Sequence, residues 1–197
     1  TPKRTVLGVD FAGRVEAVGG SVTQLRPDDD VFGATAGACA EYVAVADRVV
    51  PKPANLTFEE AAAVPVAAIT AVQALRDKGR VQPGQKVLVN GASGGVGTFA
   101  VQIAKAFGAE VTGVCSTRNV ELVRSIGADH VVDYTREDFT TGGRRYDLMI
   151  DNAGSRSFSE CRRVLAPEGT LVVVGGPRDK AIRALFRMLR APLAGVG

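Results

Sequence analysis

The chain contains 197 residues, of which 46% are hydrophobic, and its 24 Lys and Arg and 21 Asp and Glu side chains give a formal net charge of +3. This length suits one large domain, or one domain and a part of another. No apolar run approaches the roughly 20 residues of a membrane span, and the charge is too mild to indicate a nucleic-acid partner. We therefore expect an α/β protein with neither nucleic acid nor membrane as a partner.

The cysteines and the histidine do not form a metal site in the sequence. Three cysteines lie far apart, and one histidine accompanies them: Cys39, Cys115, Cys161 and His130. Their spacing fits neither a set of zinc ligands nor a disulfide framework. The N-terminal residues are not followed by an apolar region with a cleavage site, so the cytoplasm is the expected location.

Residues 1–50 indicate β structure. Short apolar runs alternate with turn residues such as Pro27, Gly33 and Gly37, and a strand is expected at residues 42–45. A few short strands cannot close a β domain by themselves. This region is therefore expected to be part of something larger.

Helical patterns begin after Pro53. Thr57 and Glu60 form a capping box that predicts a short helix ending near Pro65, and a second helix is expected over residues 66–78. Strands then alternate with helices. The predicted strands are 86–90, 111–115, 130–133, 146–150 and 170–174, and the predicted helices are 96–107, 119–126 and 158–165. This alternation predicts a doubly wound parallel sheet.

A last helix is predicted over residues 179–190. It would carry an apolar face and a row of arginines, Arg183, Arg187 and Arg190. Such a helix usually packs on a sheet, and contact with a membrane or nucleic acid is the alternative.

Residues 85–107 carry the strongest chemical signal in the chain. The apolar strand 86–90 is followed at once by the sequence ASGGVG at 92–97, and apolar residues then recur at helical spacing. Glycines let a backbone approach phosphates, and a helix N-terminus offers unpaired N–H groups and a positive dipole end. The pattern therefore predicts binding of a dinucleotide pyrophosphate, with a structural glycine turn as the alternative.

The choice of nucleotide can be inferred from the next strand end. An NAD-binding protein places Asp or Glu on the ribose hydroxyls, about 20 residues beyond the glycine loop. This chain has no carboxylate there and instead has Ser116, Thr117 and Arg118. Hydroxyls and a guanidinium suit a 2′-phosphate, which predicts NADPH in preference to NADH. Arg118 as a solvated residue at a helix start is the alternative.

Several segments in one fixed order resemble the medium-chain dehydrogenase/reductase superfamily, in its zinc-independent, quinone oxidoreductase-like branch. They are LGVDFAGRVEAVG (7–19), CAEYVAV (39–45), LTFEEAAAVPVAAITAVQAL (56–75), VLVNGASGGVGTFAVQIAK (87–105), IGADHVVDY (126–134), YDLMIDNAG (146–154) and GTLVVVGG (169–176). The resemblance implies a partial GroES-like catalytic domain in residues 1–64. It also implies an NAD(P)-binding Rossmann domain in residues 65–197 that lacks its last strand.

The resemblance also predicts that the chain is part of a longer protein and that its chemistry needs no metal. Family members begin upstream of Leu7 and continue past Gly197 with a strand that commonly pairs subunits. We therefore expect an internal fragment, poorly active by itself, of a full-length parent that is a homodimer. Zinc-dependent relatives have a histidine where this chain has Val9, which implies a metal-free enzyme.

Cofactor contacts follow from the resemblance as well. Residues of the glycine turn are expected to wrap the pyrophosphate: Ser93, Gly94, Gly95, Val96 and Gly97. Five further contacts are expected at Thr70, Tyr134, Asn152, Gly175 and Gly176. The alternative for Thr70 is a solvent-facing position on its helix. The alternative for Gly175 and Gly176 is a role as simple turn residues.

The function implied is transfer of hydride from NADPH to a quinone or an α,β-unsaturated carbonyl compound. An enoyl-thioester reductase is the nearest alternative. A non-catalytic NADPH-binding redox sensor or interaction protein is an alternative of another class. No catalytic acid or base is assigned, and structural roles are favoured for the two polar candidates, Asp10 and Glu41.

Overall fold

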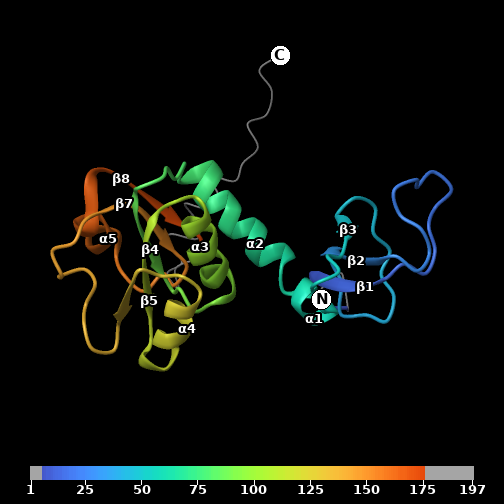
Figure 1. The fold of residues 1–197 in the computed structure, drawn as a ribbon, viewed down its shortest axis with the longest axis horizontal. Helices are drawn as coiled ribbons and strands as arrows, with labels where there is room; N and C mark the ends of the chain where they lie inside the picture. Colours follow the sequence, from blue (N-terminus) through green and yellow to red (C-terminus); the bar gives the residue numbers. More distant parts are fainter. Residues whose placement is uncertain (1–5, 176–197) are drawn as a thin grey trace, which may run out of the picture. The chain divides into compact units, whose positions relative to one another are not determined.

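The computed structural model describes residues 6–175, and the chain divides into two compact units, Thr1–Ile69 and Thr70–Gly197 (Figure 1). Each unit is described by itself. The predicted helix at 179–190 and Gly176 lie outside the described residues.

The first unit contains an antiparallel sheet of three strands. Strands β1 (Asp10–Arg14), β2 (Asp30–Ala34) and β3 (Val49–Pro51) follow one another in space as in sequence. Helix α1 (Phe58–Ala62) packs on β1 and β2. The predicted capping box is confirmed, because Thr57 accepts a hydrogen bond from the backbone of Glu60 and Glu60 accepts one from the backbone of Thr57.

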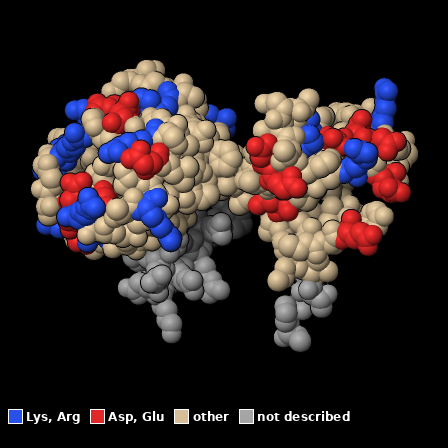
Figure 2. Space-filling model, turned by 60° about the horizontal axis from the view of Figure 1, so that its bottom comes forward, with Lys and Arg blue, Asp and Glu red and all other residues tan. Residues whose placement is uncertain are grey.

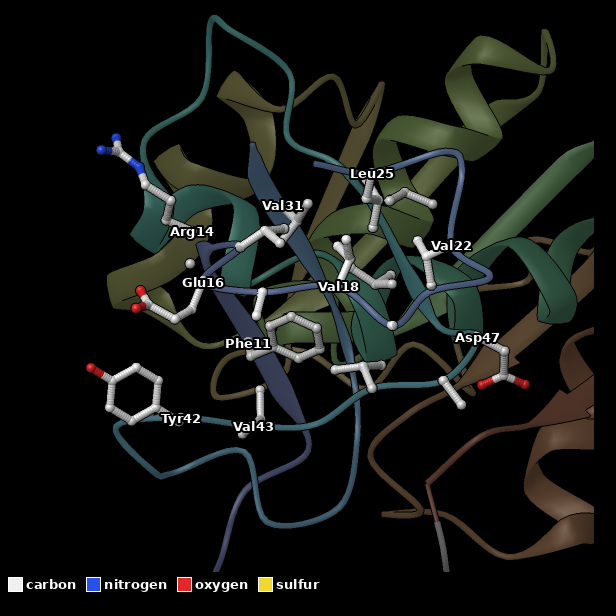
Figure 3. Close-up of a pocket in the computed structure, with 18 of the residues that line it drawn as sticks. Phe11, Arg14, Glu16, Val18, Val22, Leu25, Val31, Tyr42, Val43 and Asp47 are labelled. Atoms are coloured by element: carbon white, nitrogen blue, oxygen red, sulfur yellow. The ribbon is translucent and has the colours of Figure 1, made fainter. Parts of the chain in front are cut away.

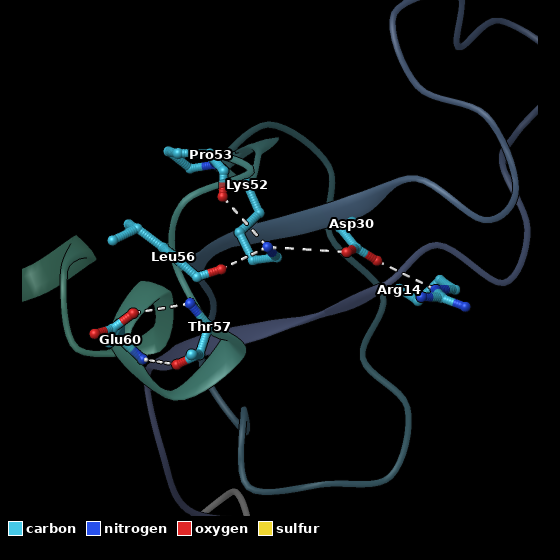
Figure 4. Close-up of polar contacts among 7 residues, drawn as sticks. All are labelled: Arg14, Asp30, Lys52, Pro53, Leu56, Thr57 and Glu60. Carbon is cyan, nitrogen blue, oxygen red and sulfur yellow. Dashed lines mark hydrogen bonds and ion pairs between the residues drawn. The ribbon is translucent and has the colours of Figure 1, made fainter.

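The Lys52 side chain ties the segment before α1 to the sheet (Figure 4). Its Nζ donates to the carbonyl oxygens of Leu56 at 2.7 Å and Pro53 at 3.3 Å, and it lies 3.9 Å from a carboxylate oxygen of Asp30. Asp30 also pairs with Arg14 across the ladder, at 3.2 Å. A single partly buried ammonium group therefore links the turn, the helix start and β2.

The strand predicted at residues 42–45 is wrong. These residues are irregular, Tyr42 is 70% exposed, and their backbone makes no hydrogen bond to another described residue. Alternation of apolar residues favours a strand, but a strand forms only where a neighbouring edge accepts its hydrogen bonds. The third strand of this sheet is instead β3.

The second unit is a parallel sheet of five strands in the order β6-β5-β4-β7-β8. Their bounds are β4 Lys86–Asn90, β5 Glu110–Cys115, β6 His130–Asp133, β7 Tyr146–Asp151 and β8 Leu165–Val173. Between them lie α3 (Gly95–Ala106), the 3₁₀ turn η2 (Thr117–Asn119), α4 (Val120–Ser125) and α5 (Phe158–Val164). Helix α2 (Pro65–Val72) continues into a π-helix, η1 (Gln73–Lys78), ahead of the sheet.

Alternate residues of the central strand enter two separate cores. Val87 and Val89 pack in a cluster with residues of η1, α3 and α4, whereas Leu88 packs in a second cluster with Cys161 and Val164 of α5. Helices therefore cover both faces of the sheet, as Figure 1 shows. The predicted doubly wound sheet after part of a GroES-like β domain is confirmed.

The last described strand begins earlier than predicted. β8 starts at Leu165 rather than residue 170, and it includes Pro167 and Gly169. These two residues favour a turn, but β8 is at an edge of the sheet as described, where a proline removes no ladder hydrogen bond that the strand needs. The second predicted capping box is confirmed, since Ser157 and Glu160 exchange both bonds at the start of α5.

Candidate dinucleotide-binding site

The turn between β4 and α3 is fastened to the neighbouring strand. The backbone N–H groups of Gly91 and Ala92 both donate to the carbonyl oxygen of Val114 in β5, at 3.1 and 2.9 Å. Gly91 adopts a φ of 80°, which favours glycine. Gly94 is then the extended N-cap residue of α3, with no side-chain cap. The N–H groups of the first helical turn therefore remain available to an anion.

Two glycines of this turn have different roles. A Cβ atom on Gly97 would lie 2.1 Å from the carbonyl oxygen of Gly91, so Gly97 allows α3 to pack against the end of β4. A Cβ atom on Gly94 would meet only that same oxygen, at 3.5 Å. Gly94 therefore leaves the outer face of the turn open, and Gly97 is needed for internal packing.

The loop after β5 lies against the glycine turn. The side-chain nitrogen Nδ2 of Asn119 donates to Ser93 Oγ at 3.0 Å and to Ser116 Oγ at 3.2 Å. Arg118 is exposed and makes no hydrogen bond or ion pair with any described residue. The structure therefore brings together Ser93 and Ser116, which the sequence assigned to different phosphates. The Arg118 guanidinium, two residues after Ser116, has no partner among the described residues.

The end of β6 braces this loop. Thr117 Oγ1 donates to Asp133 Oδ2 at 2.6 Å, and Thr135 donates to Oδ1 of the same carboxylate. The hydrogen bond from Thr117, more than any other cause, holds the pKa of Asp133 below its ordinary value. The Tyr134 backbone N–H donates to Cys115, and the Tyr134 side chain is 57% exposed. Tyr134 therefore lies beside the end of β5, on the Ser116 side of the site.

A second group of polar residues gathers where β4 and β7 end. Asn90 Nδ2 donates to Asp151 Oδ1 at 2.8 Å, and that oxygen also accepts from the backbone of Ala153 and Gly154. Both polar atoms of the Asn152 side chain are buried and have no partner among the described residues. An unpaired buried amide is costly, so a ligand that offers it hydrogen bonds would be stabilised there.

Close packing surrounds Asn152. A Cβ atom on Gly175 would lie 2.1 Å from the Asn152 carbonyl oxygen, and one on Gly91 would lie 3.4 Å from the Asn152 Cβ. Glycine at 175 thus lets the end of β8 approach the end of β7. Thr70, by contrast, lies half-buried on α2, and its expected contact with the cofactor stays a prediction.

Several residues of this site were not assigned a role from the sequence. They are Asn90, Asn119, Asp133 and Asp151. Thr117, which the sequence associated with a 2′-phosphate, instead donates its hydroxyl to Asp133. Asn90 and Asp151 each end an apolar strand, and a polar residue at that point indicates the ligand-binding edge of a parallel sheet. For Asn119 no such signal exists, because its partner Ser93 belongs to another loop.

Among residues 6–69, which are the described part of the first unit, we find no comparable network of polar groups. A hollow of about 730 Å³ is lined by apolar side chains such as Phe11, Val22 and Leu25 and by charged ones such as Arg14, Glu16 and Asp47, as Figure 3 shows. Asp10 accepts a hydrogen bond from the Val66 backbone at 2.9 Å, so its role here is structural, and Glu41 is exposed.

Metal-ligand clusters and membrane spans were sought in residues 6–175. No three His, Cys, Asp or Glu side chains there converge on a point where a metal could bind. No helix in that range has the length and apolar character needed to cross a bilayer. Figure 2 shows basic and acidic side chains interspersed on the face of the second unit in view.

A parallel sheet with a glycine turn after its central strand, and with hydroxyl and amide groups at the neighbouring strand ends, defines a dinucleotide-binding Rossmann domain. The family model described as "Zinc-binding dehydrogenase" matches residues 95–194, and the model described as "Alcohol dehydrogenase GroES-like domain" matches residues 1–55. The chain belongs to the medium-chain dehydrogenase/reductase superfamily, a family of oxidoreductases, and its likeness to quinone oxidoreductase-like members is confirmed.

Three similar proteins illustrate the likeness. A 2-methylene-furan-3-one reductase of Solanum lycopersicum is 39% identical over 189 residues, which cover 89% of this chain and 48% of that protein. A mouse (Mus musculus) protein named NAD(P)H oxidoreductase RTN4IP1, mitochondrial, is 41% identical over 160 residues, which cover 75% of this chain and 40% of that protein. The solved quinone oxidoreductase of Coxiella burnetii superposes with a TM-score of 0.80 at 33% identity, covering 91% and 58%. The chain thus spans about half the length of the relatives it matches.

Proposed function

We propose that this chain binds NADPH and supports metal-free transfer of hydride to a quinone or an α,β-unsaturated carbonyl compound. The observation that carries the cofactor choice is the end of β5, where Ser116 and the unpaired Arg118 stand without a carboxylate. The nearest acid of the loop network, Asp133, already accepts hydrogen bonds from Thr117 and Thr135. Its oxygens are therefore poorly placed to select for the free ribose hydroxyls of NADH.

The residues present offer partners to both phosphate groups of NADPH, and one buried amide beyond them. The N-terminus of α3 offers N–H groups and a dipole end to the pyrophosphate, while Arg118 offers a guanidinium to the 2′-phosphate. The unpaired amide of Asn152 offers both donors and an acceptor at the end of β7. When bound, the nicotinamide supplies the hydride, and the protein contributes position and electrostatics.

The substrate class is supported by the names of two relatives. A 2-methylene-furan-3-one and a quinone share a carbonyl group conjugated to a carbon–carbon double bond. Metal-free chemistry is proposed because Val9 occupies the position where zinc-dependent family members have a histidine.

The cofactor proposal is tested by measuring dissociation constants for NADPH and NADH. Arg118→Ala removes a charge-assisted contact of about 1.5–3 kcal/mol, so NADPH should bind about 10- to 150-fold more weakly while NADH is unchanged. Arg124→Ala is the matched control, because Arg124 is an exposed arginine of the adjacent helix that pairs with Glu121 at 2.7 Å. Equal losses for NADPH and NADH in Arg118→Ala would contradict the proposal.

The reaction is tested with the protein in its full-length natural form and three acceptors: a quinone, a conjugated enone and an enoyl thioester. NADPH consumption with the quinone or enone supports the proposal, and consumption with the thioester alone supports the alternative reductase. NADPH binding without turnover of any acceptor would instead indicate a sensor. The homodimeric parent and the cytoplasmic location stay predictions, and one relative carries "mitochondrial" in its name.

A further inference from the structure

Asn119 occupies a position where its side chain would ordinarily serve its own helix. It is the N-cap residue of α4, and asparagine at an N-cap commonly accepts a hydrogen bond from the first helical turn. Here the side chain makes no such bond. The preceding 3₁₀ turn already uses backbone groups, with the Asn119 N–H donating to Ser116 and the Val120 N–H donating to Thr117. The side chain is therefore free to contact the two serines.

The direction of these hydrogen bonds determines whether each serine hydroxyl can still donate a hydrogen bond. A hydroxyl has one proton to donate and two lone pairs to accept with. Because Asn119 Nδ2 donates to both Ser93 Oγ and Ser116 Oγ, it occupies a lone pair on each and leaves each proton unused. Phosphate oxygens only accept hydrogen bonds. Both serines are thus left as donors toward anions.

No neighbouring acceptor competes for the Ser116 proton. The carboxylate of Asp133, at the adjacent strand end, accepts from Thr117 and Thr135 and makes no hydrogen bond with Ser116. The two serines belong to different loops, one ahead of α3 and one after β5. One side chain therefore sets the hydroxyl direction in both loops.

We propose that Asn119 is a positioning residue that aims the Ser93 and Ser116 hydroxyls at the pyrophosphate and the 2′-phosphate of NADPH, and so couples the two phosphate sites. This inference rests on the proposed function. It explains how a neutral residue contributes to nucleotide preference: the Ser116 contact exists only with a 2′-phosphate, whereas the Ser93 contact serves NADPH and NADH alike.

Asn119→Ala tests the proposal by calorimetric titration with four ligands: NADPH, NADH, adenosine 2′,5′-bisphosphate and AMP. Two misdirected neutral hydrogen bonds should weaken NADPH about tenfold, and one should weaken NADH about threefold. The bisphosphate should likewise lose more affinity than AMP. Asn55→Ala, at an exposed asparagine of the first unit, is the matched control and should leave all four constants unchanged.

A double-mutant cycle separates positioning from general support of the loop. With Ser116→Ala already present, Asn119→Ala should no longer change the NADPH-to-NADH ratio, because no Ser116 hydroxyl remains to be aimed. Additive losses would overturn the proposal. So would a lower free energy of unfolding with an unchanged NADPH-to-NADH ratio, which is the result expected of a residue that only fastens α4.

Asn119→Asp provides a second variant that does not depend on tolerance of alanine. Aspartate has nearly the size and shape of asparagine, and the change removes no helix-cap bond because the Asn119 side chain makes none, so folding should be retained. Its carboxylate only accepts hydrogen bonds, so it would draw both serine protons away from the phosphates, and NADPH should bind more weakly than in Asn119→Ala. Wild-type affinity for NADPH in Asn119→Asp would overturn the proposal. If the wild-type chain binds neither nucleotide, both this inference and the proposed function fail. If the wild-type chain prefers NADPH and Arg118→Ala removes that preference, the proposed function stands even when the Asn119 inference fails.

Discussion

Gly97→Ala isolates the contribution of helix packing to the nucleotide site. The added Cβ atom would lie 2.1 Å from the Gly91 carbonyl oxygen and 2.9 Å from two backbone carbons of Ala92. An ordinary contact needs roughly 3.5 Å, so the start of α3 must move away from the end of β4 by about 1 Å. The obstacle is backbone on both sides, and no side-chain rotation relieves it.

The size of the effect follows from two opposing terms. Overpacking of this kind costs about 1–3 kcal/mol, and replacing glycine by alanine in a helix recovers at most about 1 kcal/mol. We therefore expect a net loss of about 1–2 kcal/mol in the free energy of unfolding. Nucleotide binding should weaken too, because the N–H groups of α3 move with the helix.

Gly94→Ala is the control, because it should weaken nucleotide binding more than it lowers the free energy of unfolding. Its Cβ atom would meet only one backbone oxygen, at 3.5 Å, so the fold should tolerate it with a cost below about 1 kcal/mol. The same Cβ atom stands at the open N-terminus of α3, where it would obstruct a pyrophosphate. Urea unfolding and NADPH titration measure both quantities for both variants. If Gly97→Ala is as stable as the wild type, the packing argument is refuted.

Three further predictions concern the thiols and metal content. At pH 8 the native chain should react with a thiol reagent at one site, the exposed Cys39, and at all three cysteines when unfolded, because burial raises the pKa values of Cys115 and Cys161. Burial raises the pKa of Cys161 from 9.0 to about 11, so the unfolded thiol ionises first as the pH rises. The destabilisation caused by Cys161→Ala should therefore shrink between pH 9 and pH 11 in urea unfolding experiments, and a constant difference would contradict the shift. Elemental analysis after dialysis against a chelator should find no stoichiometric zinc, and its retention would contradict metal-free chemistry.

The parallel sheet could be predicted because its strands carry their own signal. Residues 86–90 and 130–133 were predicted with the bounds that the structure has. The first is a buried central strand, which is apolar on both faces, and the second is a half-buried strand at the edge of the sheet as described, with two valines at its centre. The failed strand at 42–45 has the right apolar residues but lacks a partner edge. The pattern of apolar residues thus indicates which segments are buried. Whether such a segment forms a strand depends on whether another strand lies beside it.

The site could be predicted only where one segment suffices to define it. The glycine turn contains its strand, its turn and its helix start within residues 86–97, so its position follows from the sequence. The bridge from Asn119 to Ser93 joins residues 26 positions apart and exists only because β5 lies next to β4. A contact of this kind depends on the strand order and on the loop conformations, neither of which a local pattern specifies.

The polar groups at the strand ends also explain why the site is preformed. A buried carboxylate is costly unless it is hydrogen-bonded, and Asp151 accepts from the Asn90 side chain and from two backbone N–H groups of the loop after β7. These bonds hold that loop to the end of β4 through contacts within the protein itself. The glycine turn is similarly held to Val114, and the loop after β5 is held by Asn119 and Asp133. Because these loops are already ordered, a nucleotide that binds there loses little affinity to loop ordering, and more of its contact energy contributes to binding.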